Sequence, residues 1–110
     1  MAYLEALKTL GVDQAVLTGL DGLVIESVGR GHPNPELLAA ELASLLRHMG
    51  PLAEALLGEV RRFTLATDTQ EILAVRAKDY LLAAVITRGT DRKAVGNELV
   101  RIALRLSEEL

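Results

Sequence analysis

The sequence has no cysteine and no tryptophan, and its aromatic residues amount to two tyrosines and one phenylalanine. The absence of cysteine excludes disulfide bonds, thiolate zinc sites and cysteine nucleophiles, and it favours a reducing compartment, the cytoplasm by default. Proteins that bind single-stranded nucleic acid usually stack bases on aromatic side chains along a positive groove. Because this chain has few aromatic residues and a formal net charge of -3, we do not expect it to bind nucleic acid.

Long uninterrupted hydrophobic runs are also missing, although 50% of the residues are hydrophobic. A membrane-spanning helix needs roughly 20 consecutive apolar residues, and charged residues interrupt every candidate run, so no membrane insertion is expected. The length of 110 residues fits one domain over 1–110 with a single aliphatic core. A domain this small and this apolar should have hydrophobic surface left over, which suggests a protein partner.

The sequence offers little of what catalysis or cofactor binding requires. Neither His32 nor His48 has a second histidine at helical spacing, so a metal site is not expected. The Gly-Arg-Gly segment at 29–31 lacks the lysine and hydroxyl of a phosphate-binding loop. The serines lie in no recognisable nucleophile motif. We therefore expect no enzyme, no metal and no cofactor.

Helix and strand signals are distinct in the first third of the chain. Apolar spacing predicts a short helix over 2–10, and Gly11 follows it where a left-handed helix end would lie. Apolar and β-branched runs predict strands over 14–19 and 23–28. Asp21-Gly22 between them is typical of a tight hairpin turn.

A long helix should follow, with Asn34 as its cap, Pro35 at its first position and its end near Leu57. Proline inside a helix removes one hydrogen bond, so Pro51 predicts a kink or a division into two pieces. One apolar stripe at helical spacing consists of Leu38, Leu42, Leu45, Met49, Leu52 and Leu56. A second stripe beside it, mostly of small residues, consists of Ala39, Ala43, Leu46, Gly50, Ala53 and Leu57. Two stripes exceed what one sheet contact covers, and small residues permit close approach of another helix.

The second half of the chain predicts three strands, over 60–67, 70–78 and 80–87, joined by connections too short for crossover helices. The first of them alternates polar with apolar residues, as an edge strand does. The last is apolar on both faces, as a central strand is. A final helix should begin at Thr90 or Asp91. The predicted fold is α+β, with the order α-β-β-α-β-β-β-α, and places one five-stranded antiparallel sheet between helices in three layers.

In this order, four segments together resemble the roadblock family of dynein light chains and their bacterial relatives, within the profilin-like and longin-like folds. They are Val16–Ile25, Leu37–Ala43, Glu71–Val75 and Asp79–Val85. The resemblance covers nearly the whole chain. It implies a homodimer in which the third strand pairs with its own copy and the long second helices pack antiparallel.

The sequence supports such a dimer independently, because an edge strand has unpaired backbone groups and the neighbouring helix has surplus apolar surface. The strand residues expected at the contact are Arg62, Phe63, Thr64 and Leu65. The helix residues expected there are Ala39, Ala43, Leu46 and Gly50.

The resemblance also implies a partner, because bacterial roadblock proteins resemble regulators of Ras-like small GTPases and eukaryotic ones are adaptors and scaffolds. We expect the partner to dock on the exposed sides of the paired helices, where the candidates are Glu41, Ser44, Arg47 and His48. Arg61 and Arg62 offer an arginine finger, but they are more simply read as solubilising an edge strand. The sequence does not decide whether the chain accelerates GTP hydrolysis. Acceleration could come from an inserted charged residue or from ordering of the switch regions of the GTPase.

The sequence is also consistent with two other functions. A structural adaptor would clamp a larger assembly without affecting nucleotide chemistry. A small-molecule sensor would use the same fold, although an aliphatic core offers few polar anchors for a ligand.

Overall fold

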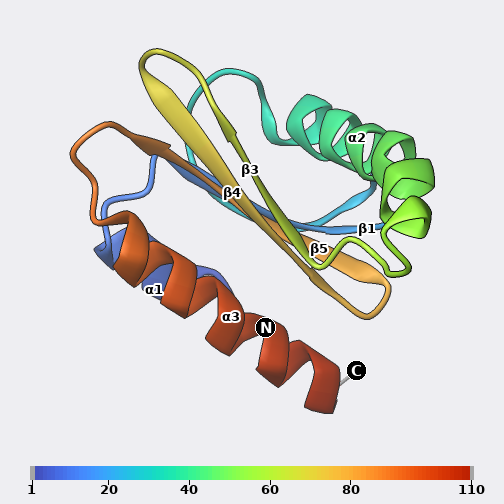
Figure 1. The fold of residues 1–110 in the computed structure, drawn as a ribbon. Coiled ribbons are helices and arrows are strands. Elements are labelled where there is room, and N and C mark those ends of the chain that lie inside the picture. The colour runs from blue at the N-terminus through green and yellow to red at the C-terminus, as the bar shows by residue number, and fades with distance from the viewer. Residues whose placement is uncertain (1, 110) are drawn as a thin grey trace.

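The computed structural model describes residues 2–109 and confirms the predicted element order. The elements are α1 (Glu5–Thr9), β1 (Gln14–Gly19), β2 (Val24–Gly29), α2 (Pro35–Ala55), β3 (Arg62–Ala66), β4 (Gln70–Ala77), β5 (Tyr80–Thr87) and α3 (Arg92–Glu109). Figure 1 shows the three layers, with α2 on one side of the sheet and α1 and α3 on the other. The fold class is therefore the predicted one.

The five antiparallel strands lie in the order β2-β1-β5-β4-β3, so β2 and β3 are the two edges. The central strand β5 is buried from Leu81 to Ile86, as its apolar sequence predicts. β3 pairs with β4 alone, with Phe63 opposite Ala74 and Thr64 opposite Leu73. The prediction of a polar third strand at an edge is confirmed.

Two hydrophobic clusters fill the spaces between the layers. The cluster on the α3 side joins α1 and α3 to the sheet through Leu7, Leu17, Leu82, Leu99 and Ile102, which are fully buried. The smaller cluster on the α2 side contains Val16, Leu38, Leu42, Ala83 and Val85. Each strand places alternate side chains on opposite faces, so one sheet serves both clusters.

The long helix α2 begins as predicted, because the Asn34 side-chain oxygen accepts a hydrogen bond from the Leu37 N–H at 2.9 Å. It continues through Pro51 to Ala55 as one helix, so the predicted division into two pieces is wrong. Proline leaves the carbonyl of Arg47 without its helical donor. Arg47 and Pro51 are both exposed, so water can satisfy that carbonyl and the helix persists.

A candidate interaction surface on β3 and α2

The free edge of β3 has a definite set of outward-facing backbone groups. The Arg76 N–H donates to the Arg61 carbonyl at 2.8 Å, and the Thr67 N–H donates to the Gln70 carbonyl at 2.8 Å. Hydrogen-bonded pairs alternate along an antiparallel ladder, so the odd-numbered residues of β3 bond to β4. The backbone N–H and C=O groups of Arg62, Thr64 and Ala66 therefore point away from the sheet.

The side chains of β3 divide between the two faces of the sheet. Arg62 lies opposite Val75, which packs with the α3-side cluster, and Phe63 lies opposite Ala74 and packs with the α2-side cluster. Leu65 shares the α2 side with Phe63 and is 47% exposed. The edge strand thus presents apolar side chains on the side of α2 and polar ones on the side of α3.

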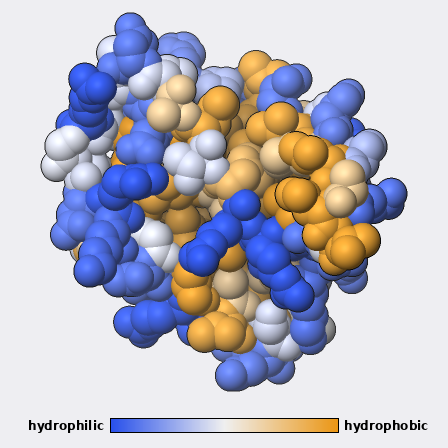
Figure 2. Space-filling model, in the orientation of Figure 1, coloured by the Kyte–Doolittle hydropathy of each residue, from blue (hydrophilic) through white to orange (hydrophobic). Residues whose placement is uncertain are grey.

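Exposed leucines continue this apolar surface onto the end of α2. Leu52 is 65% exposed and Leu56 is 76% exposed. Together with Met49, Val60 and Phe63 they line a shallow depression of about 400 Å³ between α2 and β3. Figure 2 shows hydrophobic residues gathered over the C-terminal half of α2, bordered by hydrophilic ones. We call the set of Leu52, Leu56, Phe63 and Leu65 the β3–α2 surface.

Three of the helix residues predicted at the dimer contact are buried within the chain itself. Ala39 and Ala43 are 0% and 1% exposed, and Leu46 is 8% exposed. The small residues accommodate the β1–β2 turn, since a Cβ on Gly22 would lie 3.5 Å from the Ala43 Cβ. Leu46 belongs to the α2-side core. The expectation that these three face a second helix is corrected, whereas Gly50 is only half-buried and has open space above it.

The exposure of Leu52 and Leu56 could not be predicted from helical spacing alone. Leu52 and Leu56 continue the stripe that contains Leu38 and Leu42, which face the core. Leu52 and Leu56 are exposed because the depression between the end of α2 and β3 is not filled by other side chains of the chain. Their position beyond Pro51, near the end of a long helix, was the available signal.

The residues predicted to bind a partner lie on α2 as expected, with Glu41, Arg47 and His48 exposed and Ser44 half-buried. His48 Nδ1 lies 2.8 Å from the Ser44 carbonyl oxygen, so these two are held together. The Arg47 guanidinium donates to the Leu20 carbonyl at 3.4 Å and is directed toward the β1–β2 turn. Glu41 and His48 are therefore the members of the set with the most open surface.

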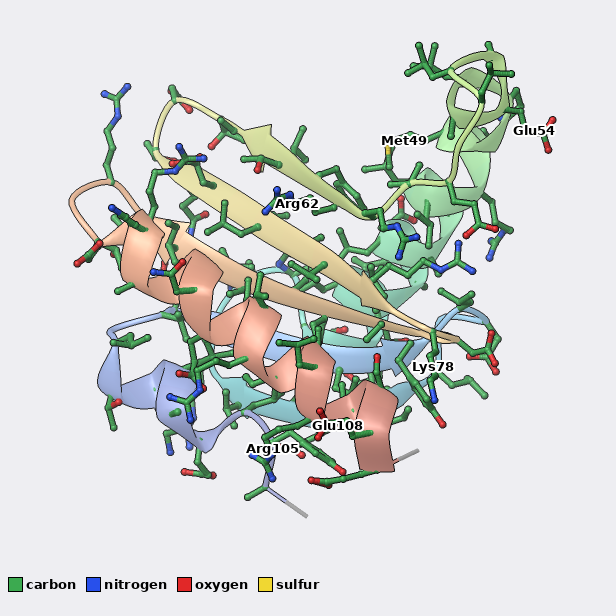
Figure 3. All side chains as sticks on the ribbon, turned by 60° about the horizontal axis from the view of Figure 1, so that its bottom comes forward. Met49, Glu54, Arg62, Lys78, Arg105 and Glu108 are labelled. Atoms are coloured by element: carbon green, nitrogen blue, oxygen red, sulfur yellow. The ribbon has the colours of Figure 1, made fainter. Side chains whose placement is uncertain are left out.

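The polar side of β3 faces a second hollow. Figure 3 shows Arg62 lying over the strands beside α3, apart from Met49 on α2. Arg62 and Thr64 line a groove of about 340 Å³ whose other wall is α3.

Within residues 2–109, no cluster of three or more histidine, aspartate or glutamate side chains could hold a metal ion. None of the helices in that range is long and apolar enough to cross a membrane.

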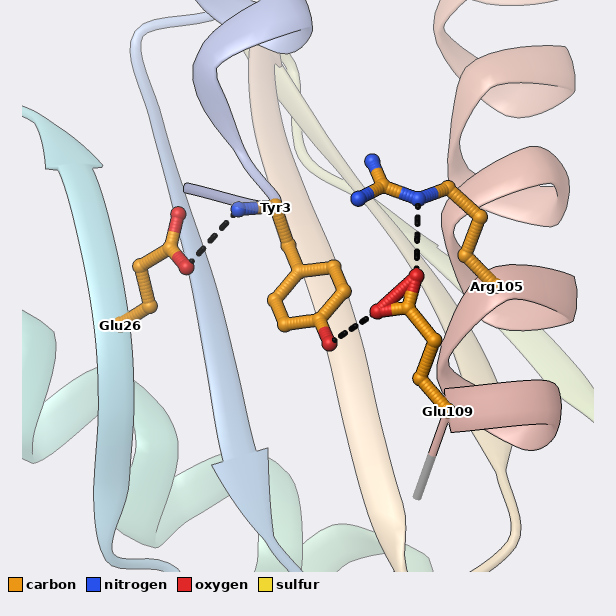
Figure 4. A network of polar contacts seen from close by, with 4 residues as sticks. All are labelled: Tyr3, Glu26, Arg105 and Glu109. Carbon is orange, nitrogen blue, oxygen red and sulfur yellow. Dashed lines mark hydrogen bonds and ion pairs between the residues drawn. The ribbon is translucent and has the colours of Figure 1, made fainter. Parts of the chain in front are cut away.

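A polar network joins the start of the chain to the end of α3. The Tyr3 hydroxyl donates to Glu109 at 2.8 Å, and Arg105 lies 3.5 Å from the same carboxylate and stacks over the Tyr3 ring (Figure 4). Glu26 accepts hydrogen bonds from the backbone N–H groups of Tyr3 and Leu4 at 3.0 and 2.7 Å. The hydrogen bond to Glu109, followed by burial, raises the pKa of Tyr3 above its ordinary value of 10.0. These contacts fix α1 and α3 against the sheet.

Comparisons with known proteins agree with this architecture. Residues 2–87 match the family model of the Roadblock/LC7 domain. A search of curated protein sequences found no match. Among solved structures, MglB of Myxococcus xanthus superposes with a TM-score of 0.88 at 17% identity, covering 97% of this chain and 90% of that one.

Two further structures extend the comparison. A Roadblock/LC7 domain from Streptomyces avermitilis has a TM-score of 0.79 at 22% identity and covers 88% of this chain and 83% of its own. Profilin II of Acanthamoeba castellanii has a TM-score of 0.74 at 16% identity, with 99% and 97% covered. At these identities the superpositions establish the shared fold.

Proposed function

We propose that this chain, which belongs to the Roadblock/LC7 domain family, is a homodimeric, non-enzymatic module that binds a Ras-like small GTPase and regulates it. The observation that carries the proposal is the unpaired edge of β3 beside the exposed leucines at the end of α2. An uncovered edge strand and an adjacent apolar surface are each a liability in a monomer. One two-fold contact with a second copy covers both.

The outward backbone groups of β3 favour one register for that contact. Only Arg62, Thr64 and Ala66 have free groups, so they must pair with the same three residues of the second copy. Centring the two-fold axis on Thr64 uses all of them and gives about six hydrogen bonds between strands, against about four when the strands slip by one pairing step. In this register Phe63 lies opposite Leu65 of the second copy.

The α2 side of the joined sheet would then gather apolar surface from both subunits. Phe63 and Leu65 from each copy meet at the axis, and Leu52 and Leu56 border them. The dimer contact that we propose therefore comprises Arg62, Phe63, Thr64 and Leu65, with Gly50, Leu52 and Leu56 replacing the buried residues of α2. The roadblock resemblance implies a GTPase as the further partner, and we place its docking surface on the outer side of α2 around Glu41 and His48.

Sedimentation equilibrium tests the dimer. We expect the protein to be dimeric at tens of micromolar, and Leu65→Asp to produce a folded monomer, because a charge would be buried at the axis. Leu104→Asp, an exposed leucine on α3, is the matched control and should remain dimeric. A wild-type protein that is monomeric at this concentration would overturn the proposal.

The GTPase role requires a separate measurement. A small GTPase from the source organism should bind the immobilised protein in one nucleotide state and not in the other, and its hydrolysis of GTP should change when this protein is added. Glu41→Lys and His48→Glu should weaken that binding without affecting dimerisation. Nucleotide-independent binding with unchanged hydrolysis would support a structural adaptor instead.

A further inference from the structure

The groove between β3 and α3 opens on the α3 side of the sheet and shares Arg62 and Phe63 of β3 with the depression on the α2 side. α3 packs on β4 and β5 and leaves the α3 side of β3 uncovered. The strand wall includes Arg62, Thr64 and Val75, and the helix wall includes Lys93, Gly96 and Val100. We call this space, of about 340 Å³, the α3 groove.

The rim of the α3 groove is positively charged in a protein whose net charge is -3. Arg62 extends from β3, and Arg92 and Lys93 extend from the first turn of α3. Arg92 forms an ion pair with Glu71 at 3.1 Å, whereas Arg62 and Lys93 form no ion pair within residues 2–109.

The α3 groove has an apolar floor, and its helix wall combines apolar residues with Arg92, Lys93 and Asn97. Val100 on the helix wall is 39% exposed. A Cβ added to Gly96 would meet no atom within 4 Å, so the middle of the helix wall has room for a side chain from outside. The groove thus combines an apolar lining with cations on two sides.

We propose that the α3 groove binds an acidic amphipathic helix of a partner protein. The apolar lining fits the apolar stripe of such a helix, and Arg62 and Lys93 complement acidic residues beside that stripe. A helix is favoured over an added strand because the groove presents side chains, while the free backbone groups of β3 lie at its edge. A partner here leaves α2 unobstructed, so a second protein can bind while α2 is occupied.

Fluorescence anisotropy with synthetic peptides tests this inference. The probe is a labelled amphipathic peptide with leucines at i, i+3, i+4 and i+7 and glutamates on its flanks, and the control peptide carries lysines in place of the glutamates. We expect the glutamate peptide to bind, with an affinity that falls as salt is added. The lysine peptide should bind at least about tenfold more weakly, a difference of about 1.4 kcal/mol.

Gly96→Leu separates groove binding from effects on folding. The leucine would fill the groove, and replacing a helical glycine should raise the melting temperature. The variant should therefore lose the glutamate peptide while becoming more stable. Arg101→Leu, which also adds an exposed leucine to α3 but outside the groove, should bind as the wild type does.

Charge reversal gives a second readout. Lys93→Glu should weaken binding of the glutamate peptide and strengthen binding of the lysine peptide. Gly96→Leu binding the glutamate peptide as tightly as wild type, or wild type binding both peptides equally, would overturn the assignment. Binding of the wild-type protein to anionic lipid vesicles in preference to the glutamate peptide would also overturn it.

Discussion

Thr64→Pro separates the proposed dimer from the fold of the single chain. The Thr64 N–H points away from β4, so proline at this position removes no hydrogen bond from the sheet of one subunit. Proline is tolerated in edge strands whose N–H faces solvent. The same N–H lies at the two-fold axis of the proposed dimer, where both copies would donate to each other.

The expected magnitude follows from the hydrogen bonds at that axis. Each subunit loses one donor, so two hydrogen bonds are lost, at about 1 kcal/mol net each. A loss of about 2 kcal/mol weakens the dimer about 30-fold, because 1.4 kcal/mol corresponds to a factor of ten. The proline ring adds bulk between the strands, so this is a lower bound.

Sedimentation equilibrium measures the dimer and urea unfolding at low protein concentration measures the subunit. We expect Thr64→Pro to shift the protein toward monomer while the free energy of unfolding of the monomer falls by less than about 1 kcal/mol, the span of strand propensities. Leu65→Pro is the matched control, because its N–H bonds to β4 and its loss should destabilise the monomer itself. A Thr64→Pro protein that dimerises like the wild type would refute the proposed pairing.

Three predictions concern the single chain. Asn34→Ala removes the cap of α2 and should lower the free energy of unfolding by about 1 kcal/mol in urea titrations. Gly22→Ala should lower the free energy of unfolding more than Gly89→Ala does. Both glycines have positive φ, so each substitution adds a strain of about 1–2 kcal/mol, but only a Cβ at position 22 would crowd the backbone of α2, at 3.2 Å. In a variant lacking the other tyrosine, the absorbance of Tyr3 should titrate above pH 10.0, and Glu109→Gln should lower its pKa. Because folding raises the pKa of Tyr3, the protonated hydroxyl stabilises the folded chain, and this stabilisation is fully present below pH 10.0. It is lost as the pH rises through the raised pKa of Tyr3 in the folded state.

The glycine and Tyr3 predictions each have an outcome that would contradict them. An equal decrease in the free energy of unfolding for Gly22→Ala and Gly89→Ala would mean that the β1–β2 turn does not pack closely on α2. An unchanged Tyr3 titration in Glu109→Gln would show that the hydrogen bond between them does not control the pKa.

Local signals in the sequence were enough to predict the order of the elements. Three such signals are the Asn34 cap, the Asp21-Gly22 turn and the run of β5 that is apolar on both faces. Each can be recognised from a few consecutive residues. The edge position of β3 followed from its alternation of polar and apolar residues. These features specify structure locally, so they survive in the folded chain.

The surface of α2 could not be predicted in the same way. Helical spacing shows which residues share a stripe, but what covers the stripe depends on the rest of the fold. Ala43 is buried because the β1–β2 turn approaches it, and Leu56 is exposed because it borders an unfilled depression between α2 and β3. The α3 groove is a similar case, since Arg62 and Lys93 are distant in sequence and meet only in the folded chain.

Single-cysteine cross-linking tests the proposed two-fold axis most directly, because the natural sequence has no cysteine. With the axis at Thr64, the two Cα atoms of this residue should lie about 5.5 Å apart, within the range that a disulfide bond spans. The two copies of residue 62 should lie about 14 Å apart. We predict that mild oxidation links Thr64→Cys into a covalent dimer and leaves Arg62→Cys unlinked. Equal linking of the two variants, or none at Thr64→Cys, would contradict the β3-paired dimer.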